Sequence, residues 1–250
     1  MKARGTRRFA IELAVAGGLV LVLLLIALPF LNGAREGTLR ASCMNNLKQM
    51  GLVFKMYANE HREYWPPLSP YRENWMADVS VLYPEYLTDL QVLVCPNSPF
   101  RHETVFVGGG GQGAAPQPQC VSSLFYLYTG YMVCSDEEAL ALFDSAGESW
   151  PGQGMPVLEL DVPQLPGSDR TKGFGQAGIP VLWDRVPLRE EEFAHTAPLG
   201  INVLHMDGHV KFVPYSHYNN SNFFPATRVG AETFGSVAPS MPASCYDDWG

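Results

Sequence analysis

One uninterrupted apolar run, residues 9–31, constrains this chain more than any other feature of its sequence. It reads FAIELAVAGGLVLVLLLIALPFL and holds one ionisable residue, Glu12, among its 23 positions. A helix of that length, rising about 1.5 Å per residue, extends roughly 34 Å, slightly more than the bilayer's hydrocarbon core of about 30 Å. In lipid a segment must satisfy its own backbone hydrogen bonds, so the run is predicted to be a transmembrane helix.

The charge on either side of the run predicts its orientation. The leader, residues 1–8, carries Lys2, Arg4, Arg7 and Arg8 and no acidic residue. The whole chain has a net charge of −8, so the remainder carries −12 once those four positive charges are set aside. Positive residues beside a membrane helix stay cytoplasmic. We therefore expect a single-pass membrane protein with a cytoplasmic N-terminus and a large acidic head on the outside. An acidic head argues against nucleic acid as a partner.

A cleaved signal peptide is the alternative interpretation of the run. Signal peptides have an apolar core of about 7–15 residues, followed by a small-x-small cleavage site. The run is longer than that, and the nearest site, Asn32-Gly33-Ala34, fits poorly. We expect the segment to stay attached as an anchor, with the lipid bilayer as a partner.

Three residues in and beside the run carry particular expectations. Glu12 lies about one turn into the membrane, where an acid either snorkels to the interface or marks a functional site that needs a partner. Arg8 precedes it by four residues on the same helical face and could neutralise it. Pro29 removes a backbone hydrogen bond, so a kink is expected over residues 25–29.

A second helical pattern follows the run. Apolar residues recur at spacings of 4, 4, 3, 4 and 3, which form one stripe of a helix with 3.6 residues per turn. They are Leu39, Cys43, Leu47, Met50, Phe54 and Tyr57. Pro66 and Pro67 end the pattern. We expect residues 32–63 to continue the helix as an amphipathic half, packed on a head formed by residues 64–250.

The head reads as an α+β domain of short strands and long connections, because Gly, Pro and aromatic residues interrupt most periodic runs. Strands are predicted at residues 105–107, 124–133, 157–160 and 181–183. Ser135 and Glu138 form a capping box before a short helix. The strongest prediction is an antiparallel hairpin over residues 201–213, with Asp207-Gly208 in a tight type I′ turn. The amphipathic half-helix is expected to pack on the resulting antiparallel sheet.

Four residues of metal-ligand type cluster around this hairpin: His195, His205, Asp207 and His209. His205 and His209 flank the predicted turn, so they could lie on one face. Zinc takes three or four N, S or O ligands, and calcium takes carboxylate oxygens. A zinc or calcium ion on His195, Asp207 and His209 is one interpretation, and a polar hairpin tip with exposed histidines is the other. No nucleophile–base pairing is evident around them, so no catalytic residue is assigned and no enzyme is expected.

Four motifs in the chain resemble the type IV pilin and type II secretion pseudopilin superfamily, in particular the prepilin-type proteins of planctomycetes, verrucomicrobia and lentisphaerae. They are the basic leader and apolar helix with Glu12 and Pro29, the segment RASCMNNLKQMG at residues 40–51, Val94-Cys95-Pro96, and NVLHMDGHV at residues 202–210. The resemblance implies a pilin-like fold. It also implies a non-enzymatic subunit that assembles with copies of itself or other pilin-like subunits, through the N-terminal helix, into a type II secretion pseudopilus or a type IV pilus-like filament.

The resemblance also implies a role in assembly for Glu12. In the family this glutamate pairs with the N-terminal amine that processing frees on a neighbouring subunit. The family's processing site has glycine directly before phenylalanine, whereas Arg8 precedes Phe9 here, so Arg8 is the candidate substitute for the amine. This departure favours an alternative function, a membrane-anchored periplasmic binding module that does not polymerise. The family also has a histidine nine residues before Asp-Gly, and eleven residues separate its counterpart here, His195, from Asp207.

The chain has five cysteines, and an exported compartment permits disulfides. One cysteine must stay unpaired or pair between chains. Cys43 and Cys95 lie in two of the family-like motifs, so the resemblance favours a Cys43–Cys95 bridge that clamps the helix to the head. The alternative is that both remain buried free thiols. Cys120 and Cys134 flank the predicted strand at residues 124–133 and are the next expected pair, which leaves Cys245 over.

Overall fold

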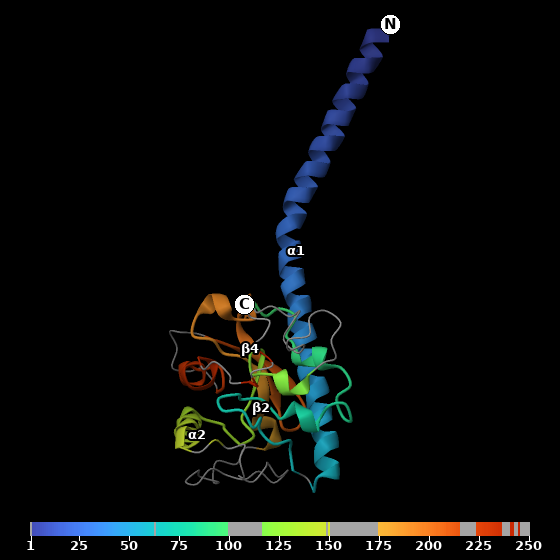
Figure 1. The fold of residues 1–250 in the computed structure, drawn as a ribbon. Helices are drawn as coiled ribbons and strands as arrows, with labels where there is room; N and C mark the ends of the chain where they lie inside the picture. Colours follow the sequence, from blue (N-terminus) through green and yellow to red (C-terminus); the bar gives the residue numbers. More distant parts are fainter. Residues whose placement is uncertain are drawn as a thin grey trace. The chain divides into compact units, whose positions relative to one another are not determined.

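The computed structural model describes residues 2–62, 64–99, 117–148, 150, 175–215, 224–236, 241–242 and 245, without the side chains of residues 2–11 and 27–32. It divides into two units, residues 1–39 and 40–250. Helix α1 (Lys2–Glu60) contributes to both (Figure 1). No helix among the described residues is long and apolar enough to cross a membrane. The run predicted to do so, residues 9–31, lies partly outside the residues whose side chains are described.

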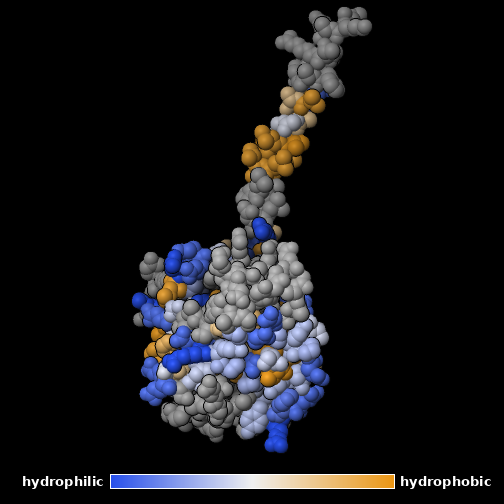
Figure 2. Space-filling model, viewed as in Figure 1, coloured by the Kyte–Doolittle hydropathy of each residue, from blue (hydrophilic) through white to orange (hydrophobic). Residues whose placement is uncertain are grey.

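The first unit is a stretch of helix without a core of its own. Every side chain from Glu12 to Ile26 is exposed. The ten large apolar side chains of this stretch are 54–66% exposed. Figure 2 shows hydrophobic side chains over most of the visible face of the stretch, interrupted by a pale patch of intermediate hydropathy.

The second unit is built on a five-stranded antiparallel sheet. Its strands are β1 (Tyr126–Tyr128), β2 (Pro180–Asp184), β3 (His195–Thr196), β4 (Leu199–His205) and β5 (Val210–Pro214). β1 pairs with β2, β2 pairs with β4, and β4 also pairs with β3 and β5. The five central residues of β4 are all buried, so this strand has core on both faces. The α+β class and the antiparallel sheet agree with the sequence analysis.

The predicted hairpin is confirmed, and its predicted turn is wrong. β4 and β5 pair from Gly200–Pro214 to Leu204–Val210. Gly208 has a φ of 97°, but Asp207 does not adopt a positive φ, as a type I′ turn would require. The Gly208 amide donates to the His205 carbonyl oxygen at 2.8 Å. The connection is therefore a three-residue loop, residues 206–208, with glycine in the left-handed position.

The second half of α1 buries one face in the head. Its buried side chains are Cys43, Leu47, Met50, Val53, Phe54, Tyr57 and Ala58. They include every residue of the predicted stripe except Leu39, which is half-buried. A Cβ at Gly51 would lie 3.1 Å from the Leu204 side chain, so this glycine lets the helix approach β4 closely (Figure 1).

Short helices and aromatic side chains complete the head. The helices are η1 (Val79–Val81), η2 (Leu90–Leu93), η3 (Pro118–Cys120), α2 (Asp136–Glu148), η4 (Gln176–Gly178), η5 (Glu190–Glu192), α3 (Arg228–Gly230) and η6 (Ala231–Gly235). The capping box of α2 forms, since Ser135 Oγ accepts from the Glu138 amide at 3.3 Å. The Glu138 carboxylate reaches back to the amide of Cys134 at 2.7 Å, one residue further than the usual box. Packing across the core is mainly edge-to-face, as in Trp183 against Phe224 at 5.6 Å between centroids.

Two of the four predicted strands fall on described residues. The strand predicted at residues 181–183 is confirmed as β2, and β1 occupies only three residues of the one predicted at 124–133. The strands predicted at residues 105–107 and 157–160 lie outside the described residues.

Candidate functional site

Strands β2, β3 and β4 each place one polar side chain on the sheet face that meets α1: Asp184, His195 and Asn202. Leu204 identifies this face, because its side chain packs next to Gly51 of α1 and residues two apart in a strand point the same way. Each of the three polar residues is 1% exposed or less. The sheet therefore delivers three polar groups into the core between itself and the helix.

One carboxylate oxygen, Asp184 Oδ2, is the hub of this group. It accepts hydrogen bonds from the Asn202 backbone amide at 2.7 Å and from Asn202 Nδ2 at 2.8 Å. It also lies 3.2 Å from His195 Nε2. The other side-chain oxygens, Asp184 Oδ1 and Asn202 Oδ1, are buried and have no hydrogen-bond partner among the described residues. Each such orphan destabilises the fold by about 1–3 kcal/mol.

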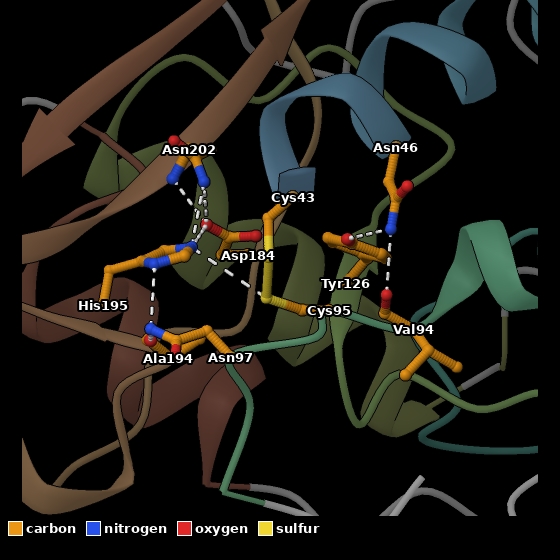
Figure 3. The surroundings of a disulfide bond; sticks show 10 residues. All are labelled: Cys43, Asn46, Val94, Cys95, Asn97, Tyr126, Asp184, Ala194, His195 and Asn202. Atoms are coloured by element: carbon orange, nitrogen blue, oxygen red, sulfur yellow. Dashed lines mark hydrogen bonds and ion pairs between the residues drawn. A yellow bond between two sulfur atoms is a disulfide. The ribbon is translucent and has the colours of Figure 1, made fainter. Parts of the chain in front are cut away.

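The imidazole of His195 joins this carboxylate to a disulfide. Its Nε2 lies 3.9 Å from Cys95 Sγ, and its Nδ1 lies 3.5 Å from Asn97 Nδ2 (Figure 3). The Asn97 amide also donates to the carbonyl oxygen of Ala194. Nε2 faces both Asp184 Oδ2 and the side-chain amide of Asn202, whose Nδ2 lies 3.0 Å away.

The predicted Cys43–Cys95 bridge is confirmed, with 5.2 Å between the two Cα atoms. It ties α1 to the segment that follows η2. One turn further along α1, Asn46 Nδ2 donates to the carbonyl oxygen of Val94 at 2.9 Å and lies 3.4 Å from the hydroxyl of Tyr126. Burial, and then the charge of Asp184, raise the pKa of Tyr126 well above its usual range, so the phenol stays neutral. The helix is thus fastened to the head at adjacent positions.

The second predicted bridge is wrong. Cys120 pairs with Cys245, not with Cys134, and 5.4 Å separates the two Cα atoms. Cys134 is a free, half-buried thiol whose amide is bonded to Glu138 at the start of α2. Because β1 is much shorter than the predicted strand, it does not hold Cys120 and Cys134 at its two ends. Burial and the charge of Glu138 raise the pKa of Cys134 to about 12, so this thiol is a poor nucleophile.

The predicted metal set of His195, Asp207 and His209 is not brought together. His195 pairs with Gly200 near one end of β4, whereas Asp207 and His209 lie beyond the other end, roughly 17 Å away at about 3.3 Å per residue. Asp207 Oδ1 accepts from the His209 amide at 3.0 Å, and both side chains are exposed. The ring of His209 stacks on His205 at 4.3 Å. Burial, and then His209, lower the pKa of His205 to about 4.

The residues assigned to assembly remain predictions. Glu12 is exposed on α1. The side chain of Arg8 lies outside the described residues, so the expected ion pair is not tested. Helix α1 is continuous through residues 25–29, and the kink expected there stays a prediction.

The sequence analysis did not identify Asp184, Asn202, Asn46 or Asn97. Asn202 had a usable signal, since it is a lone polar residue inside the apolar run at residues 201–204. Asp184 follows directly on the apolar strand at residues 181–183. Asn97 offers no such signal, because its contact with His195 depends on the path of an irregular segment.

The arrangement acts chemically as a clamp. Both sulfurs are oxidised, so neither is available as a nucleophile. Cys43, Cys95 and His195 are fully buried, so no substrate reaches them in this state. Comparisons with protein families, curated proteins and solved structures found no match to this chain.

Proposed function

We propose that this chain is a non-enzymatic, pilin-like structural subunit of a type II secretion pseudopilus or a type IV pilus-like filament. Residues 9–31 anchor it in the inner membrane and then pack against the same helix of neighbouring subunits. Residues 64–250 form the exported head. The partners are the lipid bilayer and copies of itself or other pilin-like subunits, and this function needs no cofactor.

The exposed apolar surface of α1 over residues 13–26 carries this proposal. Burying one exposed Val, Leu or Ile contributes about 1.5–3 kcal/mol. For ten such side chains that are already partly covered, the sum is on the order of 10 kcal/mol. A helix that is apolar on all sides is typical of a membrane span or a buried helix of a larger assembly. A bilayer and a bundle of identical helices both remove this surface from water.

The clamp described above supports the same function. A filament subunit must transmit force between its helix and its head. The Cys43–Cys95 bridge and the Asn46 contacts hold the second half of α1 in the head covalently and by hydrogen bonds. Two of the family-like motifs, residues 40–51 and 94–96, supply these residues.

Substitution of Glu12 tests the proposal. Tagged Glu12→Ala is co-expressed with the unaltered chain, and the tagged fraction of sheared filaments and of membranes is measured. We expect the variant to be lost from filaments while its membrane level is unchanged. Asp144→Ala, which removes an exposed carboxylate from α2, is the matched control and should incorporate normally. Normal incorporation of the Glu12 variant would contradict the proposed pairing.

A surface pocket keeps the anchored binding module as a second candidate function. It is lined by the Arg72 and Glu73 side chains together with Trp75, Phe143 and Trp150. Arg72 Nε lies 3.8 Å from Glu73 Oε1. The pocket therefore combines aromatic walls with a guanidinium donor and a carboxylate acceptor. If the chain never enters filaments and Trp75→Ala abolishes binding of a periplasmic ligand, the module is the better account.

A further inference from the structure

Three zinc-ligand groups meet inside the clamp. The sulfurs of Cys43 and Cys95 and a ring nitrogen of His195 all lie within 4.8 Å of one another. The three residues come from α1, from the segment after η2, and from β3. All three are fully buried. Two thiolates and an imidazole form a ligand set that binds zinc in preference to harder cations.

A carboxylate stands beside this set and can complete it. Asp184 Oδ2 is 3.2 Å from His195 Nε2, and Cys95 Sγ is 3.9 Å from the same nitrogen. Tetrahedral zinc with bonds of about 2.0–2.3 Å holds its ligand atoms roughly 3.3–3.8 Å apart. Figure 3 shows Asp184, His195 and the two cysteines grouped together. The buried, unpartnered Oδ1 atoms of Asp184 and Asn202 are a second, independent sign of a polar site.

We propose that the reduced chain binds one zinc ion through Cys43, Cys95, His195 and Asp184. The disulfide and the zinc ion are then alternative fastenings between α1 and the head. Asn202, which donates twice to Asp184, and Asn97, beside the outer nitrogen of His195, orient the ligands from outside. The proposal does not depend on assembly into filaments.

The exchange between the two fastenings balances in atoms and electrons. A dithiol reductant gives two electrons and two protons to the Cys43–Cys95 bond and leaves as its own disulfide. Zinc then displaces the protons of both thiols, which go to water. His195 binds the metal through Nε2 and keeps its single ring proton on Nδ1, where a turned Asn97 amide can accept it.

The exchange leaves the net charge of the buried site unchanged. Reduction and loss of both thiol protons place two negative charges on the sulfurs, and the divalent ion balances them. Loading zinc therefore introduces no additional uncompensated charge into the core, where such a charge would be strongly disfavoured.

Cobalt binding to the full-length chain in detergent tests the proposal. Cys120, Cys134 and Cys245 are changed to Ser, the remaining bridge is reduced with a phosphine that is then removed without air, and Co²⁺ is added. We expect one equivalent to bind with the visible and thiolate charge-transfer bands of tetrahedral cobalt, and Zn²⁺ to displace it. The unreduced chain should show no such bands.

Variants separate this site from adventitious binding. His195→Asn should abolish the tetrahedral bands. Asn97→Ala should weaken binding about 10–100-fold, because the Asn97 amide no longer orients the ring of His195. His209→Asn, which removes an exposed imidazole at the hairpin, should leave binding unchanged. Bands that persist in His195→Asn, or that are absent from the reduced parent chain, overturn the proposal.

Zinc-edge X-ray absorption on the reduced, otherwise unaltered chain keeps the proposal testable if a variant fails to fold. Two sulfur and two nitrogen or oxygen ligands are expected. A shell of oxygen and nitrogen alone overturns it.

Discussion

The two described parts of helix α1 belong to one element and have opposite surroundings. Over residues 13–26 the helix is apolar on every side and exposed on every side. Over residues 43–58 it is amphipathic, with one stripe buried against the sheet and the opposite side, including Leu52, exposed. The first part has exposed side chains throughout, and the second part packs within its own unit.

The difference shows that hydrophobicity has two distinct uses in this protein. In the second part it specifies an intramolecular contact, because the 3.6-residue period aligns the stripe with the sheet. In the first part no face is singled out, and under the proposed function its surroundings are lipid or a bundle of helices instead of one partner surface. Substitutions in the two parts should therefore change different measurements.

The largest expected effect on folding comes from the buried stripe. Phe54 is fully buried and packs against Trp65 and Tyr128 at 5.6 and 5.1 Å between centroids. Phe54→Ala should lower the free energy of unfolding of the head by about 3–5 kcal/mol, because it removes apolar contacts and leaves a cavity. Denaturant unfolding of the full-length chain in detergent, followed by tryptophan fluorescence, measures this.

Leu52→Ala is the matched control, since Leu52 is two positions away and 64% exposed. It should change the free energy of unfolding by less than about 0.5 kcal/mol. Equal effects of the two substitutions would mean that the helix does not present a single buried face to the head.

The covalent clamp comes next. Changing both Cys43 and Cys95 to Ala opens a loop of 52 residues and should lower the free energy of unfolding by about 2–4 kcal/mol. The same unfolding experiment measures the loss, without reductant. An unchanged midpoint would show that the hydrogen bonds of Asn46 and the buried stripe are sufficient to hold the helix.

The apolar run should respond in a different assay. Leu21→Arg places a charge near the middle of residues 9–31 and should disfavour membrane insertion by about 2.5–3.5 kcal/mol. Membrane partitioning of the newly made chain measures this, with Leu21→Ala as the control. The unfolding midpoint of the head in detergent should stay the same. A large change in that midpoint would contradict the separation of the two parts.

Much of the head followed from the sequence wherever a local pattern decided the structure. The period of the stripe from Cys43 to Tyr57 and the apolar runs on either side of Asp207-Gly208 identified a helix face and a hairpin. The turn type was missed because Gly208 alone supplies the positive φ. The Cys120–Cys245 bridge was missed because it joins residues 125 apart, and no local pattern specifies such a pairing.

The polar cluster also could not be predicted from the sequence, for a physical reason. Its members lie on α1, on the segment after η2, and on three strands, so their proximity depends on sheet register. The Cys43–Cys95 bridge was expected through the family resemblance and not through spacing. Asp184 and Asn202 become partners only because β2 and β4 pair antiparallel, an arrangement that the sequence analysis did not assign.

The smallest expected effect is a pH dependence at the hairpin. The lowered pKa of His205, about 4 in the folded chain, means that the unfolded chain takes up this proton first, near pH 6.5. The contribution of the neutral, half-buried His205 ring to the free energy of unfolding is present above about pH 6.5. It is lost as the pH falls towards 4. After allowance for solvent screening at this half-buried ring, the loss is about 1 kcal/mol.

Urea unfolding at neutral pH and near pH 4.5 measures this loss. His205→Gln should reduce the fall in stability between the two conditions. His209→Gln removes the stacked imidazole and leaves the other residues that bury His205 in place, so its fall should be intermediate. An identical fall in all three chains would rule out His205 as the titrating group.

The central claim is that the apolar run remains part of the mature protein and lies in the membrane. Alkaline carbonate extraction of membranes, followed by intact-mass analysis of the chain in the pellet and the supernatant, tests it most directly. We predict a chain in the pellet whose mass includes residues 9–31. A chain in the supernatant that lacks those residues would contradict the account.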